Sequence, residues 1–490
     1  MNLEQYFAEF RSEIIGINQT ISTPYHDSIE LLYADWTASG RCYSGIEAIL
    51  SQQVMPFVAN THTDTNTTGA GLTYAYHKAQ KIIKKHVNAG AEDVLINAGS
   101  GMTGVVNKLQ RILGLRVHEK YKNMLPDNED RPIVFITHME HHSNQTSWLE
   151  TIADVVIIEP NEDGLVDLNN FSMLLEKFKN RTLKIAAVTS CSNVTGIITP
   201  YYEISKMIHS YGGYCFVDFA CSAPYINIDM HPADIEAKLD AIYFSPHKFL
   251  GGPGSAGVLV FDKCLYKNSV PDNPGGGTVE WTNPWKQHKY IDDIEAREDG
   301  GTPPFMQTIR TALCIKLKEK MGVENIIARE HEILEIIWGN LSEIENLHIL
   351  SFNNKERLTV LSFYIDDLHY NLAVKILNDR FGIQTRGGCS CAGTYGHYLL
   401  NVDQNHSNSI TCKINEGDYS DKPGWVRASF HPTMTNEEIL KFCDSIKLLC
   451  ENHHVWSKDY IFDRIKGTIS HIKSDDRFIY NHIDHAFSLL

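Results

Sequence analysis

The middle of the chain alternates short apolar runs with segments of helical periodicity. The runs are apolar almost throughout, rather than at every second position, and they comprise Asp93–Asn97, Pro132–Thr137, Asp154–Glu159, Lys184–Thr189, Tyr214–Asp218 and Ala241–Phe244. Strands of this kind are typical of a mostly parallel sheet that helices cover on both faces. The pattern therefore predicts an α/β fold. Ligands of such sheets bind beyond the carboxyl ends of the strands.

A second αβ pattern follows a Gly- and Pro-rich stretch at Pro271–Pro304. We expect a long helical pattern around Thr308–Trp338 and then, in order, a strand at Leu358–Ile365, a helix at Tyr370–Phe381, strands at Gly382–Arg386 and Trp425–Phe430, and a helix at Asn436–Cys450. This organisation predicts four parts: an N-terminal helical segment (1–30), a large domain (31–305), a smaller C-terminal α/β domain (306–451) and a helical appendage (452–490). The polar stretch Leu400–Lys422 is interpreted as an insertion.

Composition and charge exclude several classes of function. The chain has 490 residues and a formal net charge of -16, so no basic excess is present to bind nucleic acid or an anionic membrane. No apolar run reaches the roughly 18 residues of a membrane span, and Met1–Ile15 has the pattern of an amphipathic helix rather than of a secretion signal. Eleven scattered cysteines favour reduced thiols and a cytoplasmic location. We expect chemistry on a small molecule.

Lys248 and Asp218 follow two of the predicted strands. A lysine amine can hold the aldehyde of pyridoxal phosphate as a Schiff base, and a carboxylate can keep the pyridine nitrogen of that cofactor protonated. Either residue alone is more often a solvated loop charge or a helix cap. Together, at the same edge of one sheet, they indicate a pyridoxal-phosphate site.

Two further segments supply groups that such a site needs. Gly99–Gly104 precedes a helical run, where backbone N–H groups and the hydroxyl of Ser100 or Thr103 can bind a phosphate. The strand Pro132–Thr137 leads into His138–Asn144, whose histidines can stack on a planar ring and move protons. Tandem histidines are also typical of surface and metal sites. A metal is disfavoured because no cysteine or carboxylate stands at zinc-finger spacing nearby.

The segment Arg386–Gly393 places two thiols in a glycine-rich loop after a strand, where a thiolate can reach a substrate and withdraw. An incidental thiol pair, or a zinc site completed by His397 and Cys412, is the alternative. Arg427 interrupts a short apolar strand and can clamp a substrate carboxylate, although an arginine there is more often part of a surface ion pair.

Taken together, the stretches between about Tyr33 and Leu449 resemble the fold-type I, class V aminotransferase-like enzymes, and among them the group II cysteine desulfurases and selenocysteine lyases. The resemblance implies that Lys248 carries the cofactor and Asp218 meets its pyridine nitrogen. The other contacts that it implies are Gly101, Met102, Thr103, Ser245 and His247 with the phosphate, His141 with the ring and as a catalytic residue, and Asn193 with the ring hydroxyl. It further implies that Arg427, with Asn193, binds the substrate, and that a homodimer forms in which Thr278 reaches the phosphate of the neighbouring subunit.

Cys391 aligns with the persulfide-forming cysteine of these enzymes, so the resemblance implies removal of sulfur from L-cysteine, release of alanine and transfer of the sulfur to an acceptor protein. Three departures leave alternatives open. Cys221 stands where desulfurases usually have glutamine or histidine. The doublet of Cys389 and Cys391 is similar to the loop of molybdenum-cofactor sulfurase domains, so either thiol can be the catalytic one. The loop from Cys391 to Arg427 is longer than in the typical desulfurase. Transamination, C–S lysis, racemisation and epimerisation remain alternative reactions, and a non-catalytic binding protein is an alternative class.

Overall fold

The structure is a computed structural model. It describes residues 2–61, 63, 65–122, 124, 130–419, 422–463, 467–473 and 478–489. The expectations for Met1, for residues 420 and 421 of the insertion, and for residues 464–466, 474–477 and 490 of the appendage lie outside these described residues. Within them, no helix combines the length and the apolar character that crossing a membrane requires.

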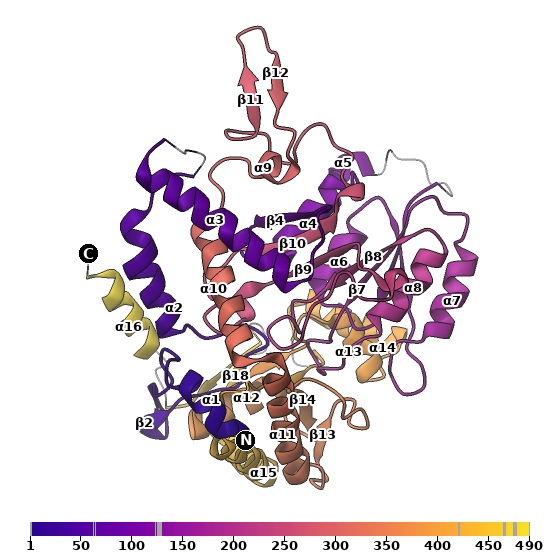
Figure 1. The fold of residues 1–490 in the computed structure, drawn as a ribbon. Helices are drawn as coiled ribbons and strands as arrows, with labels where there is room; N and C mark the ends of the chain where they lie inside the picture. Colours follow the sequence, from indigo (N-terminus) through magenta and orange to yellow (C-terminus); the bar gives the residue numbers. More distant parts are fainter. Residues whose placement is uncertain are drawn as a thin grey trace.

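The elements of the described residues follow one another as shown in Figure 1. The α-helices are α1 Leu3–Arg11, α2 Ser44–Ile49, α3 Thr67–His86, α4 Met102–Ile112, α5 Glu119–Lys122, α6 His142–Leu149, α7 Leu168–Lys177, α8 Tyr201–Ser210, α9 Ile294–Glu298, α10 Phe305–Met321, α11 Val323–Leu341, α12 Tyr370–Phe381, α13 Gly393–Leu399, α14 Gln404–Asn415, α15 Asn436–Trp456 and α16 Phe478–Phe487. The strands are β1 Thr20–Thr23, β2 His26–Glu30, β3 Leu32–Tyr33, β4 Asp93–Ala98, β5 Ile133–Thr137, β6 Asp154–Ile158, β7 Lys184–Thr189, β8 Tyr214–Asp218, β9 Ala241–Phe244, β10 Gly257–Asp262, β11 Val279–Thr282, β12 His288–Tyr290, β13 Leu347–Ile349, β14 Val360–Ile365, β15 Ile383–Gln384, β16 Arg386–Gly388, β17 Trp425–Ser429, β18 Tyr460–Asp463 and β19 Thr468–His471.

Seven strands form the central sheet, in the order β4-β10-β9-β8-β7-β5-β6. All six strands expected from the apolar runs are present in it. The seventh, β10, was not expected, and it alone runs antiparallel to its two neighbours. The prediction of an α/β fold with a mostly parallel sheet is confirmed.

Both faces of this sheet are buried, which explains why its strands are apolar at successive positions. In β5 the side chain of Phe135 belongs to one hydrophobic cluster and that of its neighbour Val134 to the other. Helices α7 and α8 contribute to the first cluster and α4 to the second. The sheet is therefore the middle of three layers. The turns that follow its parallel strands lie together at the carboxyl edge of the sheet.

A smaller antiparallel sheet has the order β13-β14-β17-β16 and packs with α11, α12 and α15. The single helical pattern expected around Thr308–Trp338 is two helices, α10 and α11, because Gly322 between them has a positive φ of 74°. The strand expected at Gly382–Arg386 is also divided. Its first part, β15, pairs with β3 near the N-terminus, whereas β16 begins at Arg386 and pairs with β17.

The two ends of the chain depart from the helical expectation. Helix α1 is present as expected, but it ends at Arg11 and a hairpin of β1 and β2 follows. In the appendage, α15 extends to Trp456, a second hairpin of β18 and β19 comes next, and only α16 is helical after that. The expected helical appendage therefore has helices at its two ends and a hairpin between them. The expected insertion contains α14, and the division into four parts stays a prediction.

Candidate active site

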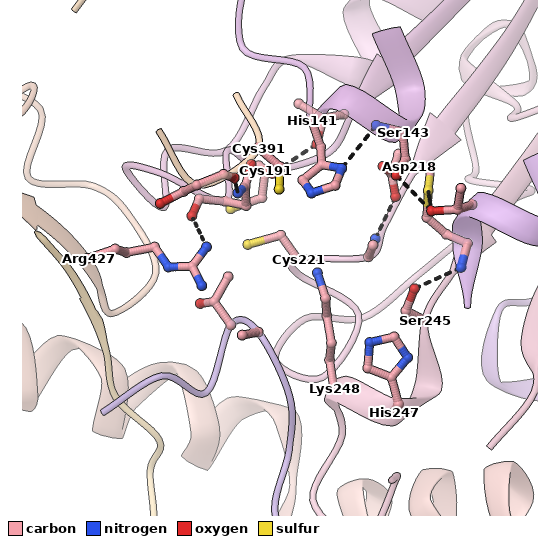
Figure 2. Close-up of a pocket in the computed structure, with 18 of the residues that line it drawn as sticks. His141, Ser143, Cys191, Asp218, Cys221, Ser245, His247, Lys248, Cys391 and Arg427 are labelled. Atoms are coloured by element: carbon pink, nitrogen blue, oxygen red, sulfur yellow. Dashed lines mark hydrogen bonds between the residues drawn. The ribbon is translucent and has the colours of Figure 1, made fainter. Parts of the chain in front are cut away.

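A cavity of about 210 Å³ lies at the carboxyl ends of β5, β7, β8 and β9, with β16 and β17 on its other side. It is lined by Thr37, Ala38, Met102, Thr103, His141, Ser143, Thr189, Cys191, Asn193, Asp218, Ala220, Cys221, Ser245, His247, Lys248, Arg386, Ser390, Cys391 and Arg427. Figure 2 shows the side chains of Lys248, His141 and Arg427 converging on it from different segments. Most of the predicted site residues are thus brought together, as a sheet with this topology requires.

Asp218 and Lys248 face the cavity from neighbouring strand ends. Asp218 is the last residue of β8, its Oδ1 accepts a hydrogen bond from the backbone N of Ala220 at 2.8 Å, and burial raises the pKa of this carboxyl to about 6. Lys248 ends the short helical turn η4 (Pro246–Lys248) after β9. Burial lowers the pKa of its amine, while the nearby Cys221 and Asp218 oppose that shift. A lysine whose neutral form is favoured in this way is a better nucleophile.

The start of α4 forms a cradle against the turn that carries Lys248. The Oγ of Ser245 accepts a hydrogen bond from the backbone N of Met102 at 2.8 Å. The ring of His247 lies 3.0 Å, by its Nδ1, from the carbonyl of Ser100. A Cβ on Gly101 would come within 3.0 Å of the Ser245 Oγ, so a side chain there would crowd this contact. Helix N-termini of this kind bind anions.

The hydroxyl of Thr103 extends the cradle on the side of α6. It lies 2.7 Å from the hydroxyl of Ser143, a residue of the first turn of α6 that sequence reasoning did not single out. Two hydroxyls and the backbone N–H groups of α4 therefore border the same part of the cavity.

His141 caps the start of α6 and faces the cavity with a neutral ring. Its Nδ1 accepts a hydrogen bond from the backbone N of Ser143 at 3.1 Å, which leaves its proton on Nε2. Burial, reinforced by the positive charge of Lys248, lowers the pKa of His141 to about 3. A neutral imidazole suits a position against the face of a planar cofactor.

Glu140, which was not predicted, ties the ends of β5 and β7 together behind His141. Its carboxylate accepts hydrogen bonds from the hydroxyl of Thr137 at 2.6 Å and from the backbone N of Thr189 at 2.9 Å. A third comes from the amide of Asn144 at 2.7 Å. Burial raises the pKa of Glu140 to about 7. Its neighbours in the sequence, His138–Asn144, had drawn attention only for their histidines.

Arg427 enters the cavity from β17 and is held by a carboxylate that the sequence did not reveal. Its Nη2 lies 2.7 Å from the Oδ1 of Asp35, and its Nη1 donates to the carbonyl of Asn193 at 3.2 Å. Asp35 also binds the Nε of Arg386, at 3.1 Å. Arg427 is only 3% exposed, so the alternative of a surface ion pair is wrong.

The loop Arg386–Gly393, which carries the two thiols, is held against the end of the large sheet by two hydrogen bonds around Cys391. The amide of Asn193 donates to the carbonyl of Ser390 at 2.7 Å, and the backbone N of His142 donates to the carbonyl of Cys391 at 2.7 Å. Ser390 and Cys391 have positive φ angles of 50° and 57°, which non-glycine residues rarely adopt. Such strain is common at functional sites.

The two thiols of the loop differ in position. Cys391 is exposed and lines the cavity. Cys389 does not line it; it is partly buried and packs on the hydrophobic cluster that includes Trp425. The structure thus brings Cys391, and not Cys389, to Lys248. Within the described part of the chain, no group of three or more His, Cys, Asp or Glu side chains is arranged to hold a metal.

Thr278 is not among the residues that line the cavity. It is buried at the base of the β11–β12 hairpin, which projects from the top of the molecule in Figure 1, and its hydroxyl donates to the carbonyl of Gly275 at 2.7 Å. That Thr278 acts on a neighbouring subunit stays a prediction.

Comparisons with known proteins place these observations in a family. The model of the family Aminotransferase class-V matches residues 33–442. A probable cysteine desulfurase of Halalkalibacterium halodurans is 28% identical over 370 residues, which are 74% of this chain and 84% of that protein. A cysteine desulfurase of Haloferax volcanii is 26% identical over 435 residues, which are 87% of this chain and 92% of that protein.

Solved structures share the fold. The apo structure of a cysteine desulfurase from Thermococcus onnurineus NA1 has a TM-score of 0.72 at 23% identity, covering 91% of this chain and 98% of that one. The cysteine desulfurase CsdA from Escherichia coli has a TM-score of 0.69 at 20% identity, with the same coverage of 91% and 98%. The prediction of a fold-type I architecture is confirmed.

Proposed function

We propose that this chain, which belongs to the class V aminotransferase family, is a pyridoxal-phosphate-dependent enzyme that removes sulfur from L-cysteine. The products would be alanine and a persulfide on Cys391. One observation carries the proposal: an exposed thiol on a strained loop lines the same cavity as Lys248, Asp218 and Arg427. Relatives named as cysteine desulfurases support the choice of substrate.

The cavity meets the requirements of the cofactor, which is typical of this family. A phosphate needs donors at a helix start, and the glycine at position 101 keeps side-chain atoms out of the space that Ser245 and His247 border at the start of α4. A ring hydroxyl needs a polar partner, and the Oδ1 of Asn193 is buried with no hydrogen-bond partner among the described residues. An aldehyde needs an amine, and Lys248 reaches the cavity with its pKa lowered by burial.

Lys248 and Asp218 would divide the acid–base work. Pyridoxal phosphate, when bound, supplies an aldehyde that a lysine amine can hold and a ring that withdraws electrons from the substrate Cα. Lys248 would hold that aldehyde through its Nζ, and when this atom is free it would accept the proton of the substrate Cα. Asp218 would be the residue that holds the proton of the ring nitrogen. Its raised pKa, about 6 without such a partner, falls when a positive charge lies next to it.

His141 and Arg427 would position the reactants. The ring of His141 is neutral, with its proton on Nε2, so it can cover the cofactor without adding charge and can pass a proton on the cavity side. Arg427 presents a guanidinium that Asp35 orients, and its Nε is buried without a partner in the described structure. A substrate carboxylate would fill that vacant position.

Cys391 would carry out the sulfur transfer. Its thiolate attacks the sulfur of the bound cysteine, a new S–S bond forms as the Cβ–S bond breaks, and the electron pair of the broken bond stays on the carbon, which is then protonated to give alanine. The hydrogen bonds from His142 and Asn193 to the loop backbone hold Cys391 at the cavity during this step. The persulfide is then available to an acceptor protein.

Product analysis with L-cysteine tests the proposal. The cofactor-loaded enzyme with a reductant is expected to release alanine and sulfide in equal amounts. Cys391→Ser is expected to abolish both, and Cys389→Ser, the matched control two residues away, to retain both. If Cys389→Ser is the inactive variant, the roles of the two thiols are reversed; if Cys391→Ser turns over at the parental rate, a thiol-based desulfurase is excluded.

The same preparation separates the alternatives. Conversion of cysteine to its keto acid with the sulfur retained, and transfer of the amino group to a second keto acid, would indicate an aminotransferase, and an inverted Cα would indicate a racemase or epimerase. A protein that binds no pyridoxal phosphate, and on which borohydride leaves no adduct at Lys248, would be a non-catalytic relative. We further propose that the enzyme is a homodimer in which Thr278 contacts the phosphate of the other subunit; Thr278→Ala would then weaken cofactor retention.

A further inference from the structure

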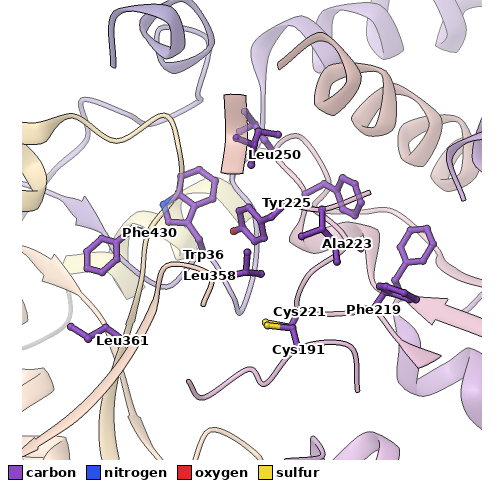
Figure 3. Packing of buried hydrophobic residues seen from close by; sticks show 14 of the residues in the cluster. Trp36, Cys191, Phe219, Cys221, Ala223, Tyr225, Leu250, Leu358, Leu361 and Phe430 are labelled. Carbon is purple, nitrogen blue, oxygen red and sulfur yellow. The ribbon is translucent and has the colours of Figure 1, made fainter. Parts of the chain in front are cut away.

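Two thiols that the proposed reaction does not use lie side by side in the wall of the cavity. Cys191 follows β7 and Cys221 follows β8, and these strands are parallel neighbours with Thr189 paired to Asp218. Both cysteines line the cavity, although only 1% of Cys191 and 5% of Cys221 is exposed. Both sulfur atoms lie near one carbonyl oxygen, that of Ser192, at 3.6 Å from the Sγ of Cys191 and 3.7 Å from the Sγ of Cys221, and Figure 3 shows the two sulfur atoms together.

The backbone around both thiols is tied together, so the pair is a fixed feature. The hydroxyl of Ser190 lies 2.6 Å from that of Ser222, which joins the residue before Cys191 to the residue after Cys221. The amine of Lys318, from α10, holds the Cys221 turn by donating to the carbonyl of Ala223 at 2.6 Å. Neither thiol can move far from the other without breaking these contacts.

The surroundings of the pair make its members chemically different. The neighbouring Cys191 and the positive charges of Lys248 and Arg427 lower the pKa of Cys221 against the effect of its burial. Burial and the neighbouring Cys221 raise the pKa of Cys191. Cys221 is therefore the more acidic thiol of the pair. A more acidic thiol with a second thiol beside it is the arrangement of redox-active cysteines.

The other buried thiols lack this arrangement. Cys215, Cys314, Cys443 and Cys450 do not line the cavity, and burial raises the pKa of each. Burial alone therefore does not account for the pairing of Cys191 with Cys221.

We propose that Cys191 and Cys221 form a peroxide-reactive dithiol that closes to a disulfide inside the cavity. The thiolate of Cys221 attacks one oxygen of hydrogen peroxide or of a small hydroperoxide, the O–O bond breaks, and the leaving hydroxide or alkoxide takes up a proton. Cys191 then attacks the sulfenic sulfur, its proton goes to the departing hydroxide, and water leaves. Two thiols are oxidised by two electrons in all, and the peroxide is reduced by the same two.

The disulfide would change the cavity at Lys248. Cys221, when it is ionised, raises the pKa of the Lys248 amine, and a disulfide would carry no such charge. Reduction of the bond by a dithiol restores the two thiols. This chemistry requires neither cysteine turnover nor Cys391, so it stands or falls independently of the proposed desulfurase activity.

Thiol mapping of the cofactor-loaded protein tests the proposal. We would expose the Cys391→Ser protein, from which the reactive loop thiol has been removed, to hydrogen peroxide, alkylate it in denaturant and digest it without reductant. Mass spectrometry is expected to show one dominant cross-link, Cys191 to Cys221, at least tenfold above any other pair and reversed by dithiothreitol. Cys443→Ser, a buried thiol away from the cavity, is the matched control and should retain the cross-link.

Two further variants order the steps. In Cys191→Ser, oxidation is expected to stop at a sulfenic acid on Cys221 that dimedone traps, whereas Cys221→Ser should leave Cys191 reduced. Cys264 and Cys412, which are exposed, report that peroxide has acted. The proposal is overturned if both cavity thiols are recovered reduced after these exposed thiols have been oxidised, or if the cross-link joins Cys221 to a cysteine other than Cys191.

Discussion

The two walls of the cavity are built in different ways. On the side of the large sheet (the sheet wall), Asp218 ends β8 and Lys248 follows β9, so their positions depend on the backbone of these two strands. On the opposite side (the loop wall), Arg427 and Cys391 depend on contacts between distant segments. The carboxylate of Asp35 holds Arg427, and a hydrogen bond from Asn193 holds the strained loop that carries Cys391. The first wall sets charge and protonation, whereas the second sets the position of the substrate and the reactive thiol.

Because the two walls are built differently, we expect them to respond differently to substitution. Changes on the sheet wall should remove chemistry or shift protonation, because burial controls the pKa values there. Changes on the loop wall should weaken binding while the cofactor remains in place. Four substitutions test that contrast, and the largest effect is expected at Lys248.

Lys248→Ala is expected to remove the chemistry altogether. Loss of the residue that holds the cofactor and moves the Cα proton should lower the rate of alanine formation by about 10⁴-fold. The variant should also lose the lysine adduct formed by borohydride. Lys263→Ala, at an exposed lysine, is the control and should match the parent protein. An active Lys248→Ala protein would contradict the assignment of the sheet wall.

Glu140→Gln is expected to remove a pH dependence of stability from the sheet wall. The pKa of Glu140 is raised from 4.5 to about 7 in the folded protein, so the folded state binds a proton that the unfolded chain has already released. The free energy of unfolding therefore falls as the pH rises from 4.5 to about 7, by up to about 3 kcal/mol.

Urea unfolding of both proteins at pH 4.5 and pH 7.5 measures the effect. The free energy of unfolding of the parent, relative to that of Glu140→Gln, should fall by about 3 kcal/mol between the two pH values. Glu92→Gln, at an exposed residue, should show no such change relative to the parent. Parallel pH profiles for the parent and Glu140→Gln would show that Glu140 is ionised in both states.

Arg427→Lys is expected to weaken substrate binding on the loop wall. A lysine keeps the charge but loses the forked geometry that matches a carboxylate, and this should raise the KM for cysteine about 30-fold, or by about 2 kcal/mol. The value of kcat should change much less, because the interaction is present in ground state and transition state alike. Steady-state kinetics at saturating cofactor measure both constants. A loss confined to kcat would place Arg427 in the chemical step.

Asp35→Asn is expected to give the smallest effect. Asparagine can still accept a hydrogen bond from Arg427, which also keeps its contact with the carbonyl of Asn193. The KM should rise about fivefold, by about 1 kcal/mol, as the guanidinium becomes less well oriented. Asp27→Asn, at an exposed residue of the same N-terminal region, is the control. An unchanged KM would show that Asp35 serves stability rather than orientation.

The sheet wall could be predicted from the sequence because strands that are buried on both faces have a recognisable local pattern of apolar residues. A strand between two helical layers must be apolar at successive positions, and this made β5, β7, β8 and β9 recognisable together with the residues that follow them. The same rule says nothing about direction. The run at Gly257–Asp262 is equally apolar, yet the sequence did not reveal that β10 joins the sheet antiparallel.

The loop wall could be predicted only in part because its contacts are non-local. Arg427 and Cys391 were found by motif, but nothing near Asp35 indicates that it binds an arginine 392 positions away. The same holds for the pair of Cys191 and Cys221, which are 30 residues apart and meet only because β7 and β8 are neighbours. Pairings of this kind are a property of the topology.

The contacts of the N-terminal segment set an order on folding during synthesis. Arg11 pairs with Glu438, Glu4 accepts a hydrogen bond from the backbone of Asn436, and Tyr25 binds Asp459. Each of these residues is therefore translated more than 400 positions before its partner. Until the partner segments are made, α1 and its apolar side chains lack their native cover.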